Sequence, residues 1–133
     1  MGGVVLVLLD TCALLWWTLD PDRLSEKARQ VCDSIHQEGA FISSVSVWEI
    51  GIKMQKGLLE IGESLSGYVS RLKSLSCVEI IAVDEEIWIQ NILIEWQNRD
   101  PADRTIVATA LIRDLPIMTK DQIILDYYSK TIW

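Results

Sequence analysis

Short apolar runs and helical periods alternate along the chain. Val4–Leu9 is a continuous apolar run between Gly3 and Asp10, which is typical of a strand buried on both faces. Later runs of the same kind predict further short strands. These are Ala40–Ser43, Val78–Val83, Pro116–Thr119 and Lys130–Trp133.

Between these runs, apolar residues recur at the spacing that places them on one face of a helix. The predicted helices are Ala13–Leu19, a helix capped by Ser25 and stopped by Gly39, Val47–Lys56, a helix through Leu65 and Leu75, residues 85–97, and a helix from Asp100 to Arg113. Ser44 or Ser46 is predicted to cap the helix that Gly57 ends.

Strands that alternate with helices at these separations predict right-handed crossovers and a parallel sheet with helices on both faces. No linker or repeat divides the 133 residues, so we expect one domain over residues 1–133, built as a three-layer α/β/α sandwich. In such a fold, ligands gather at the carboxyl ends of the strands. Side chains that follow the strands are therefore the first candidates for a functional site.

The chain is acidic, with a formal net charge of -7 and a pI of about 4.6. This acidity argues against broad electrostatic binding of nucleic acid, which needs Lys and Arg to neutralise phosphates. A phosphate-containing substrate is still compatible, because carboxylates that hold Mg²⁺ or Mn²⁺ present the positive charge of the ion to it. The N-terminal apolar run is too short to cross a bilayer, and no basic residue precedes it. We expect a cytoplasmic protein with no membrane partner.

Sulfur and imidazole groups are scarce. His36 is the single histidine, and Cys12, Cys32 and Cys77 show no metal-ligand spacing. We therefore expect neither a zinc site nor a histidine-activated nucleophile. Any chemistry must rest on carboxylates, hydroxyls, Lys and Arg.

Acidic residues recur at corresponding ends of separate elements. Asp10 follows the first predicted strand, Glu49 lies in the predicted first turn of the helix after the second, and Asp121 follows the fourth strand. Asp100 and Asp103 lie at the start of a later helix. Because a parallel sheet brings these ends to one edge, we expect the carboxylates to lie together and to need a cation that offsets their repulsion.

Helix capping explains each acid taken singly. The Asp100–Asp103 segment is a well-formed helix start, with an N-cap, a proline and an acid in the first turn. Glu49 could be a helix-dipole residue paired with Lys53, and Asp10 and Asp121 could each cap the segment after their strand. Asp10 fits capping alone least well, because it interrupts two apolar runs and an ionised buried carboxylate needs a partner.

Four segments, in this order and spacing, resemble the PIN domain family, and within it the VapC-like toxins of bacterial type II toxin–antitoxin pairs. They are LLDTCALLWW, SVSVWEIGIK, RDPADRTIVATAL and PIMTKD. The resemblance covers nearly the whole chain. It implies a parallel five-stranded sheet in the order 3-2-1-4-5, with Asp84, after the edge strand, outside the site.

The resemblance also implies an activity, which is hydrolysis of RNA phosphodiester bonds by an endoribonuclease that uses Mg²⁺ or Mn²⁺. The implied metal-binding and catalytic acids are Asp10, Glu49, Asp103 and Asp121, with Asp100 accessory. The implied partners are a small antitoxin and a second copy of the chain in a homodimer. Relatives often carry histidine where this chain has Cys12 and Asn98, so we expect altered substrate contacts around an intact acidic set.

Residues beside the acids are candidates for substrate contact, and they are Thr11, Lys53, Arg104 and Thr119. The two hydroxyls could bind a water or a phosphate oxygen, and the two cations could contact RNA phosphates. Turn hydrogen bonds and pairing with neighbouring acids are the competing roles.

Two other functional classes and one silent class remain as alternatives. A phosphoryl-accepting receiver domain would use Asp84 and Lys120, but it wants an acidic pair after the first strand, and Leu9 precedes Asp10 here. A haloacid-dehalogenase-type phosphatase needs an aspartate at the position of Cys12. A catalytically silent binding domain would keep its acids only for capping.

Overall fold

A parallel sheet forms the centre of the molecule, of which the computed structural model describes residues 6–133. Within these residues the strands are β1 Leu8–Leu9, β2 Ala40–Ser43, β3 Val78–Ile81, β4 Ile117–Met118 and β5 Thr131–Ile132. All neighbouring strands pair in parallel, in the order β3-β2-β1-β4-β5. The predicted fold class and strand order are confirmed. Val4 and Val5, at the start of the first predicted strand, lie outside the described residues.

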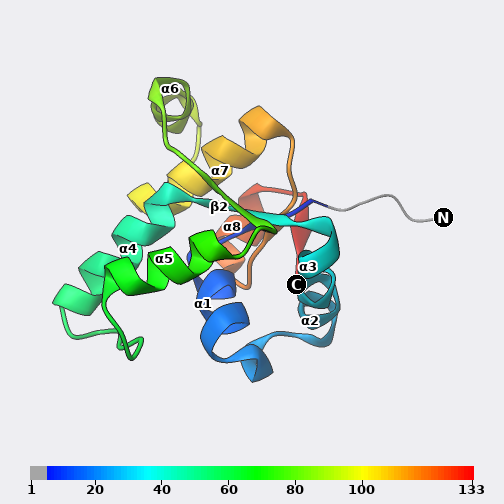
Figure 1. Ribbon diagram of the computed structural model, residues 1–133. Helices are drawn as coiled ribbons and strands as arrows, with labels where there is room; N and C mark the ends of the chain where they lie inside the picture. The colour runs from blue at the N-terminus through cyan, green and yellow to red at the C-terminus, as the bar shows by residue number, and fades with distance from the viewer. Residues whose placement is uncertain (1–5) are drawn as a thin grey trace.

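Helices join the strands and cover both faces of the sheet. In the described chain they are α1 Thr11–Leu19, the 3₁₀ turn η1 Pro21–Arg23, α2 Glu26–Asp33, α3 Ile35–Glu38, α4 Ser44–Gln55, α5 Leu65–Ser74, α6 Glu85–Leu93, α7 Pro101–Arg113 and α8 Gln122–Tyr127. Figure 1 shows α6 and α7 on one side of the strands and α1 and α2 on the other. None of the helices in residues 6–133 has the length and apolar character needed to cross a membrane.

Successive strand residues point to opposite faces of the sheet and so divide the core in two. Leu9 packs in one cluster with Leu14 of α1 and Tyr68 of α5. Leu8 packs in the other cluster with Ile106 of α7. This alternation explains why the strands read as continuous apolar runs.

The α7 helix is buried around most of its circumference, with residues 105–110 all buried. Two of these residues are threonines, and each satisfies its hydroxyl within the helix. Thr105 donates to the carbonyl of Pro101 at 2.6 Å, and Thr109 donates to the carbonyl of Thr105 at 2.7 Å. The packing fixes the axis of the helix whose first turn carries Asp103.

The helix predicted from Ser25 to Gly39 is in fact two helices, α2 and α3, with a break at Ser34. The Ser34 hydroxyl donates to the carbonyl of Val31 at 2.7 Å, and this local bond competes with a continuous helix. The predicted ends are correct. Ser25 caps α2 by accepting from the backbone N–H of Ala28, and Gly39, with φ of 87°, ends α3.

The start of α4 differs from the prediction in a way that affects the site. This helix begins at Ser44, and its N-cap is Ser43, whose hydroxyl accepts from the backbone N–H of Val45 at 3.1 Å. The predictions of Ser44 or Ser46 as the cap are therefore wrong. Glu49 lies in the second turn, so it is not a helix-dipole residue of the first turn.

Two later segments also differ from the pattern. The helix predicted over residues 85–97 ends at Leu93, and residues 94–100 form a loop whose carbonyls bind the Arg104 side chain. The sequence pattern does not predict α8, which Asp121 caps by accepting from the backbone N–H of Ile123. Both differences lie at the edge of the sheet where the acids gather.

Candidate functional site

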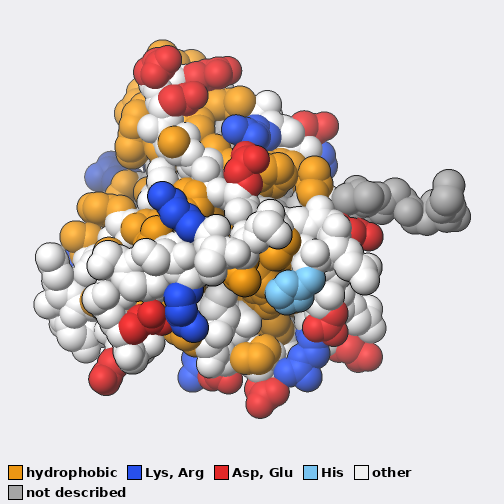
Figure 2. All heavy atoms as spheres, viewed as in Figure 1, with side chains coloured by type: hydrophobic (Ala, Val, Ile, Leu, Met, Phe, Trp, Pro, Cys, Tyr) orange, Lys and Arg blue, Asp and Glu red, His pale blue; other side chains and the backbone are white. Residues whose placement is uncertain are grey.

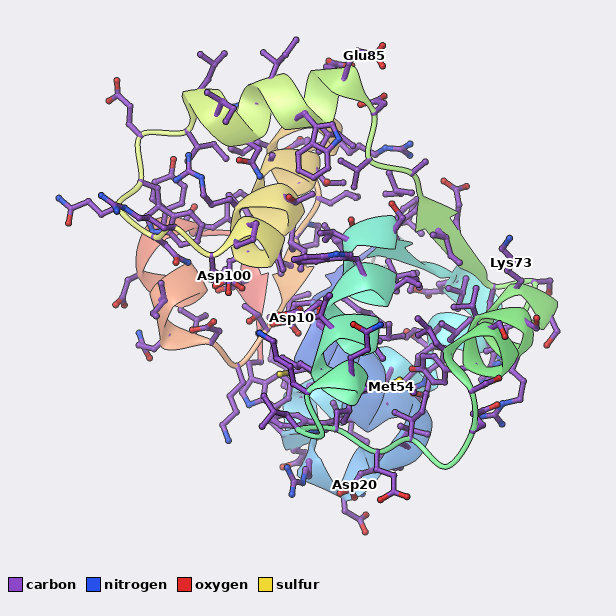
Figure 3. The ribbon with its side chains drawn as sticks, turned by 90° about the vertical axis from the view of Figure 1, so that its left-hand side faces the viewer. Asp10, Asp20, Met54, Lys73, Glu85 and Asp100 are labelled. Carbon is purple, nitrogen blue, oxygen red and sulfur yellow. The ribbon has the colours of Figure 1, made fainter. Side chains whose placement is uncertain are left out.

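A cleft of about 380 Å³ lies where the carboxyl ends of β1 and β4 meet α4 and the start of α7. It is lined by Asp10, Thr11, Cys12, Trp16, Glu49, Lys53, Asp100, Asp103, Ile106, Lys120 and Asp121. We call it the acidic cleft, because all five acids singled out from the sequence line it. Figure 3 shows the labelled Asp10 and Asp100 near one another, with Glu85 and Lys73 far out on the periphery.

Asp10 is the most buried of the acids, with 6% of its surface exposed. As the N-cap of α1, its Oδ1 accepts from the backbone N–H of Ala13 at 2.8 Å. Burial raises the pKa of its carboxyl from 3.8 to about 6. Hydrogen bonds from Thr119 and Ala13 oppose this rise in pKa, and the nearby charges of Asp121 and Glu49 add to it.

Thr119 links the two strand ends that carry Asp10 and Asp121. Its hydroxyl accepts from the backbone N–H of Asp121 at 3.0 Å, and its side chain also hydrogen-bonds the Asp10 carboxylate. Thr119 is fully buried and does not line the acidic cleft. These contacts favour a supporting role over the predicted substrate contact.

Asp100 and Asp103 have different roles at the start of α7. Asp100 is the N-cap, and its Oδ1 accepts from the backbone N–H of Asp103 at 2.9 Å. The Asp103 carboxylate accepts from the Asn98 amide at 2.9 Å. Burial raises the pKa of Asp103 to about 6, the Asn98 bond lowers it, and the charges of Asp100, Asp121 and Glu49 raise it.

The remaining predicted residues fall into two groups. Lys53 lines the acidic cleft and pairs with Glu49 at 3.6 Å, and Thr11 lines it with its hydroxyl 2.9 Å from that of Ser46. Arg104 does not line the acidic cleft. Its guanidinium donates to backbone carbonyls of α6 and of the loop before α7.

Trp16, Cys12 and Lys120 also line the acidic cleft. The sequence analysis named Cys12 only as a departure from the family pattern and Lys120 only for the receiver alternative, and it did not single out Trp16. The ammonium group of Lys120 lies 5.4 Å from the centre of the Trp16 ring, and Trp133 packs against the same ring at 5.6 Å. Burial, and next the charge of Asp10, raise the pKa of the Cys12 thiol. The spacing of Cys12 and Trp16, four residues apart in a helix after a strand, is a signal that could have identified both.

The donors of the acidic cleft fit a magnesium or manganese ion in their chemistry. They are carboxylate oxygens, the ligands such ions prefer, and burial together with mutual repulsion disfavours their ionised form unless a cation offsets it. Within residues 6–133, no group of three or more His, Cys, Asp or Glu side chains has the geometry to coordinate a metal ion directly. A hydrated Mg²⁺ ion keeps several waters and needs few direct protein ligands.

Comparisons with known proteins agree with this fold. The PIN domain profile matches residues 7–130. The chain belongs to the PIN domain family. Among curated relatives, Ribonuclease VapC22 of Mycobacterium tuberculosis is 25% identical over 117 residues, which cover 87% of each chain.

Solved structures with the same fold come from several bacteria. A toxin–antitoxin complex from Klebsiella pneumoniae matches this PIN domain with a TM-score of 0.64 and 18% identity over 96% of both chains. FitAcB from Neisseria gonorrhoeae matches with a TM-score of 0.64 and 24% identity over 91% of both chains. VapBC2 from Rickettsia felis, bound to a DNA fragment from its promoter, matches with a TM-score of 0.61 and 14% identity over 97% of this chain and 100% of the other. These likenesses establish the fold.

The topology of this PIN domain also excludes the receiver alternative. Receiver domains place the first and third strands side by side, whereas β1 here lies between β2 and β4. Asp84 does not line the acidic cleft, and its carboxylate caps α6 by accepting from the backbone N–H of Ile87 at 2.9 Å. Asp84 is therefore a helix cap.

The raised pKa of Asp10 predicts that Asp10→Asn stabilises the metal-free protein at neutral pH. Between pH 3.8 and about 6, the folded state holds a proton on Asp10 that the unfolded chain releases, so stability falls as pH rises through this window. At pH 8 we expect the substitution to increase the free energy of unfolding by about 1 to 3 kcal/mol. The gain should fade towards pH 4. Urea denaturation in EDTA at the two pH values measures it.

Asp84→Asn is the matched control for this prediction, because it makes the same substitution at the exposed N-cap of α6. An Asp10→Asn protein that is less stable than wild type at pH 8 would contradict the prediction.

Proposed function

We propose that this PIN domain is a divalent-metal-dependent endoribonuclease and the toxin of a type II toxin–antitoxin pair. The observation that carries the proposal is the convergence of acids from four separate segments on one cleft, with two of them at raised pKa. The relative named a ribonuclease, aligned over 87% of the chain, supports the same activity.

In this proposal the acids of the cleft bind the metal ion, and the lysines and Thr11 contact the substrate or a water. The residues that would hold Mg²⁺ or Mn²⁺ are Asp10, Glu49, Asp103 and Asp121, with Asp100 accessory. What a divalent ion supplies in such a site is Lewis acidity, which activates water and offsets negative charge in the transition state. Lys53 and Lys120 add positive charge at the cleft wall, where they would contact a phosphate. Thr11 is the remaining cleft hydroxyl for a phosphate oxygen or water.

The proposed antitoxin follows from charge and from the structural relatives. The Klebsiella pneumoniae structure is a toxin–antitoxin complex. The wall of the acidic cleft combines five carboxylates with only two lysines among the described residues, which suits a basic segment of a partner. We propose that such a segment enters the cleft and blocks access of RNA.

The proposed homodimer is supported by exposed apolar side chains on α4 and α6. We define the α4–α6 apolar surface by the exposed residues Trp48, Trp88, Ile89, Ile92 and Leu93. Ile92 is 78% and Leu93 65% exposed, and Trp48 and Trp88 both line a hollow of about 580 Å³. Figure 2 shows hydrophobic side chains gathered over α6. Contiguous apolar surface of this kind marks association sites.

RNA cleavage tests the proposed activity. We expect wild-type protein to cut structured RNA with Mn²⁺ and not with EDTA. Asp10→Asn should lower the rate at least about a hundredfold, because it weakens the acid set that would hold the ion. Asp84→Asn, outside the acidic cleft, should cut at the wild-type rate. If wild type cuts no RNA with Mn²⁺, the domain is the catalytically silent alternative; if Asp10→Asn cuts as fast as wild type, Asp10 has no part in catalysis.

Co-expression tests the proposed antitoxin. Induction of the chain alone should slow bacterial growth, and the small reading frame beside its gene should restore growth when expressed with it. The Asp10→Asn chain, which lacks the proposed activity, should not slow growth. Toxicity that the neighbouring frame fails to relieve would contradict the pairing.

Sedimentation tests the proposed homodimer. Ile92→Glu places a charge in the α4–α6 apolar surface, and we expect it to weaken dimerisation at least about tenfold because a buried unpaired charge disfavours association. Leu58→Glu, in the turn after α4, changes an exposed apolar residue that does not line the hollow and should leave the dimer intact. A wild-type protein that sediments as a monomer at micromolar concentration would contradict the homodimer.

A further inference from the structure

The Arg104 side chain binds the backbone of another part of the chain with all three of its nitrogens. Its Nε and Nη2 donate to the carbonyl of Asn91 at 3.2 and 2.6 Å, and Nη2 also donates to Ile94 at 2.8 Å. Its Nη1 donates to the carbonyls of Trp96 and Asn98 at 2.7 and 3.0 Å. We call this set of contacts the Arg104 clamp.

The clamp supplies hydrogen-bond donors to the free carbonyls at the C-terminus of α6. The last carbonyls of a helix lack partners within the helix, and they carry its negative dipole end. Arg104 supplies donors and positive charge to Asn91 and Ile94 there, and it also holds the chain as it leaves the helix. Only a guanidinium presents five planar donors, whereas the lysine ammonium presents three on one atom.

Asn98 connects the clamp to the acidic cleft. Its carbonyl accepts from Arg104, its side-chain amide donates to the Asp103 carboxylate at 2.9 Å, and its side-chain oxygen accepts from the backbone N–H of Asp100 at 3.1 Å. The same loop is held from the other side, because Trp96 stacks on Tyr127 of α8 with ring centres 4.7 Å apart. The loop is therefore fixed between α6, α7 and α8.

We propose that Arg104 is a positioning residue, which fixes the loop before α7 and, through Asn98, orients the Asp103 carboxylate in the acidic cleft. Arg104 lies outside the acidic cleft, and its guanidinium donates to backbone carbonyls and not to an RNA phosphate. The consequence for catalysis rests on the proposed nuclease function. The clamp itself does not.

Hydrogen–deuterium exchange tests the clamp directly. In Arg104→Met and in Arg104→Lys, we expect amides of residues 94–100 to exchange at least about tenfold faster than in wild type, because hydrogen bonds to a charged donor are lost. Arg113→Met is the matched control, since Arg113 lies at the far end of α7 and pairs with Glu79 on the surface. Wild-type protection of the loop in Arg104→Lys would show that charge suffices, and would overturn the clamp.

Manganese affinity tests the link from the clamp to Asp103. By calorimetry, Arg104→Lys and Asn98→Ala should bind Mn²⁺ about 10 to 100 times more weakly than wild type, as expected when a partner of a ligating carboxylate is removed. Asn98→Ala keeps the Arg104 side chain, so residues 94–97 should retain wild-type exchange. Unchanged Mn²⁺ affinity in both variants would refute the link. If Arg104→Met does not fold, Arg104→Lys and Asn98→Ala carry the test.

Cleavage kinetics separate positioning from RNA contact. A positioning role predicts that Arg104→Lys lowers kcat with KM unchanged, whereas a phosphate contact predicts a raised KM with kcat retained. A wild-type protein that binds Mn²⁺ but cuts no RNA would refute the proposed function alone. Loop exchange that is unaffected by either Arg104 substitution would refute the clamp alone.

Discussion

The repulsion between carboxylates gathered at one end of the sheet is the constraint to which the surrounding structure responds. Burial raises the pKa of both Asp10 and Asp103, and the negative charges of Asp121 and Glu49 raise it further. Their ionised forms are therefore disfavoured in the absence of a cation. A sequence selected for stability alone would not keep such a group. Stability that is given up locally for a functional arrangement is common at active sites.

The fold accommodates these acids by using them as helix caps. One oxygen each of Asp10, Asp100 and Asp121 accepts from a backbone N–H in the first turn of a following helix. Each cap fixes the direction of its carboxylate and supplies a positive helix end beside it. Capping and cation binding are therefore compatible roles, and the caps bring the acids to the same cleft. Glu49 and Asp103 are not caps. Glu49 lies in the second turn of α4 and pairs with Lys53, and the Asp103 carboxylate accepts from the Asn98 amide.

Much of the fold and the acid set could be predicted from the sequence, because apolar periodicity and strand-end position are local signals. Two of the misses share a cause, which is a side chain that contacts a distant part of the chain, whereas the break at Ser34 and the Ser43 cap are local. The helix predicted over residues 85–97 has an apolar pattern to its end, yet the loop carbonyls bind Arg104 instead. No local pattern reveals that Thr119 contacts Asp10, since their strands meet only through the sheet.

The two departures from the family pattern have a common physical effect on the acidic cleft. Asn98, where relatives often carry histidine, donates to Asp103 through an amide that does not titrate, so the donor of this hydrogen bond does not change with pH. Cys12, at the other such position, has a thiol whose pKa is raised by burial and by Asp10, so it stays neutral. A histidine at either position would change charge near neutral pH. In this chain, the charge of the cleft near neutrality is therefore set by its carboxylates and lysines, and Asn98 supplies a hydrogen-bond donor that does not itself titrate.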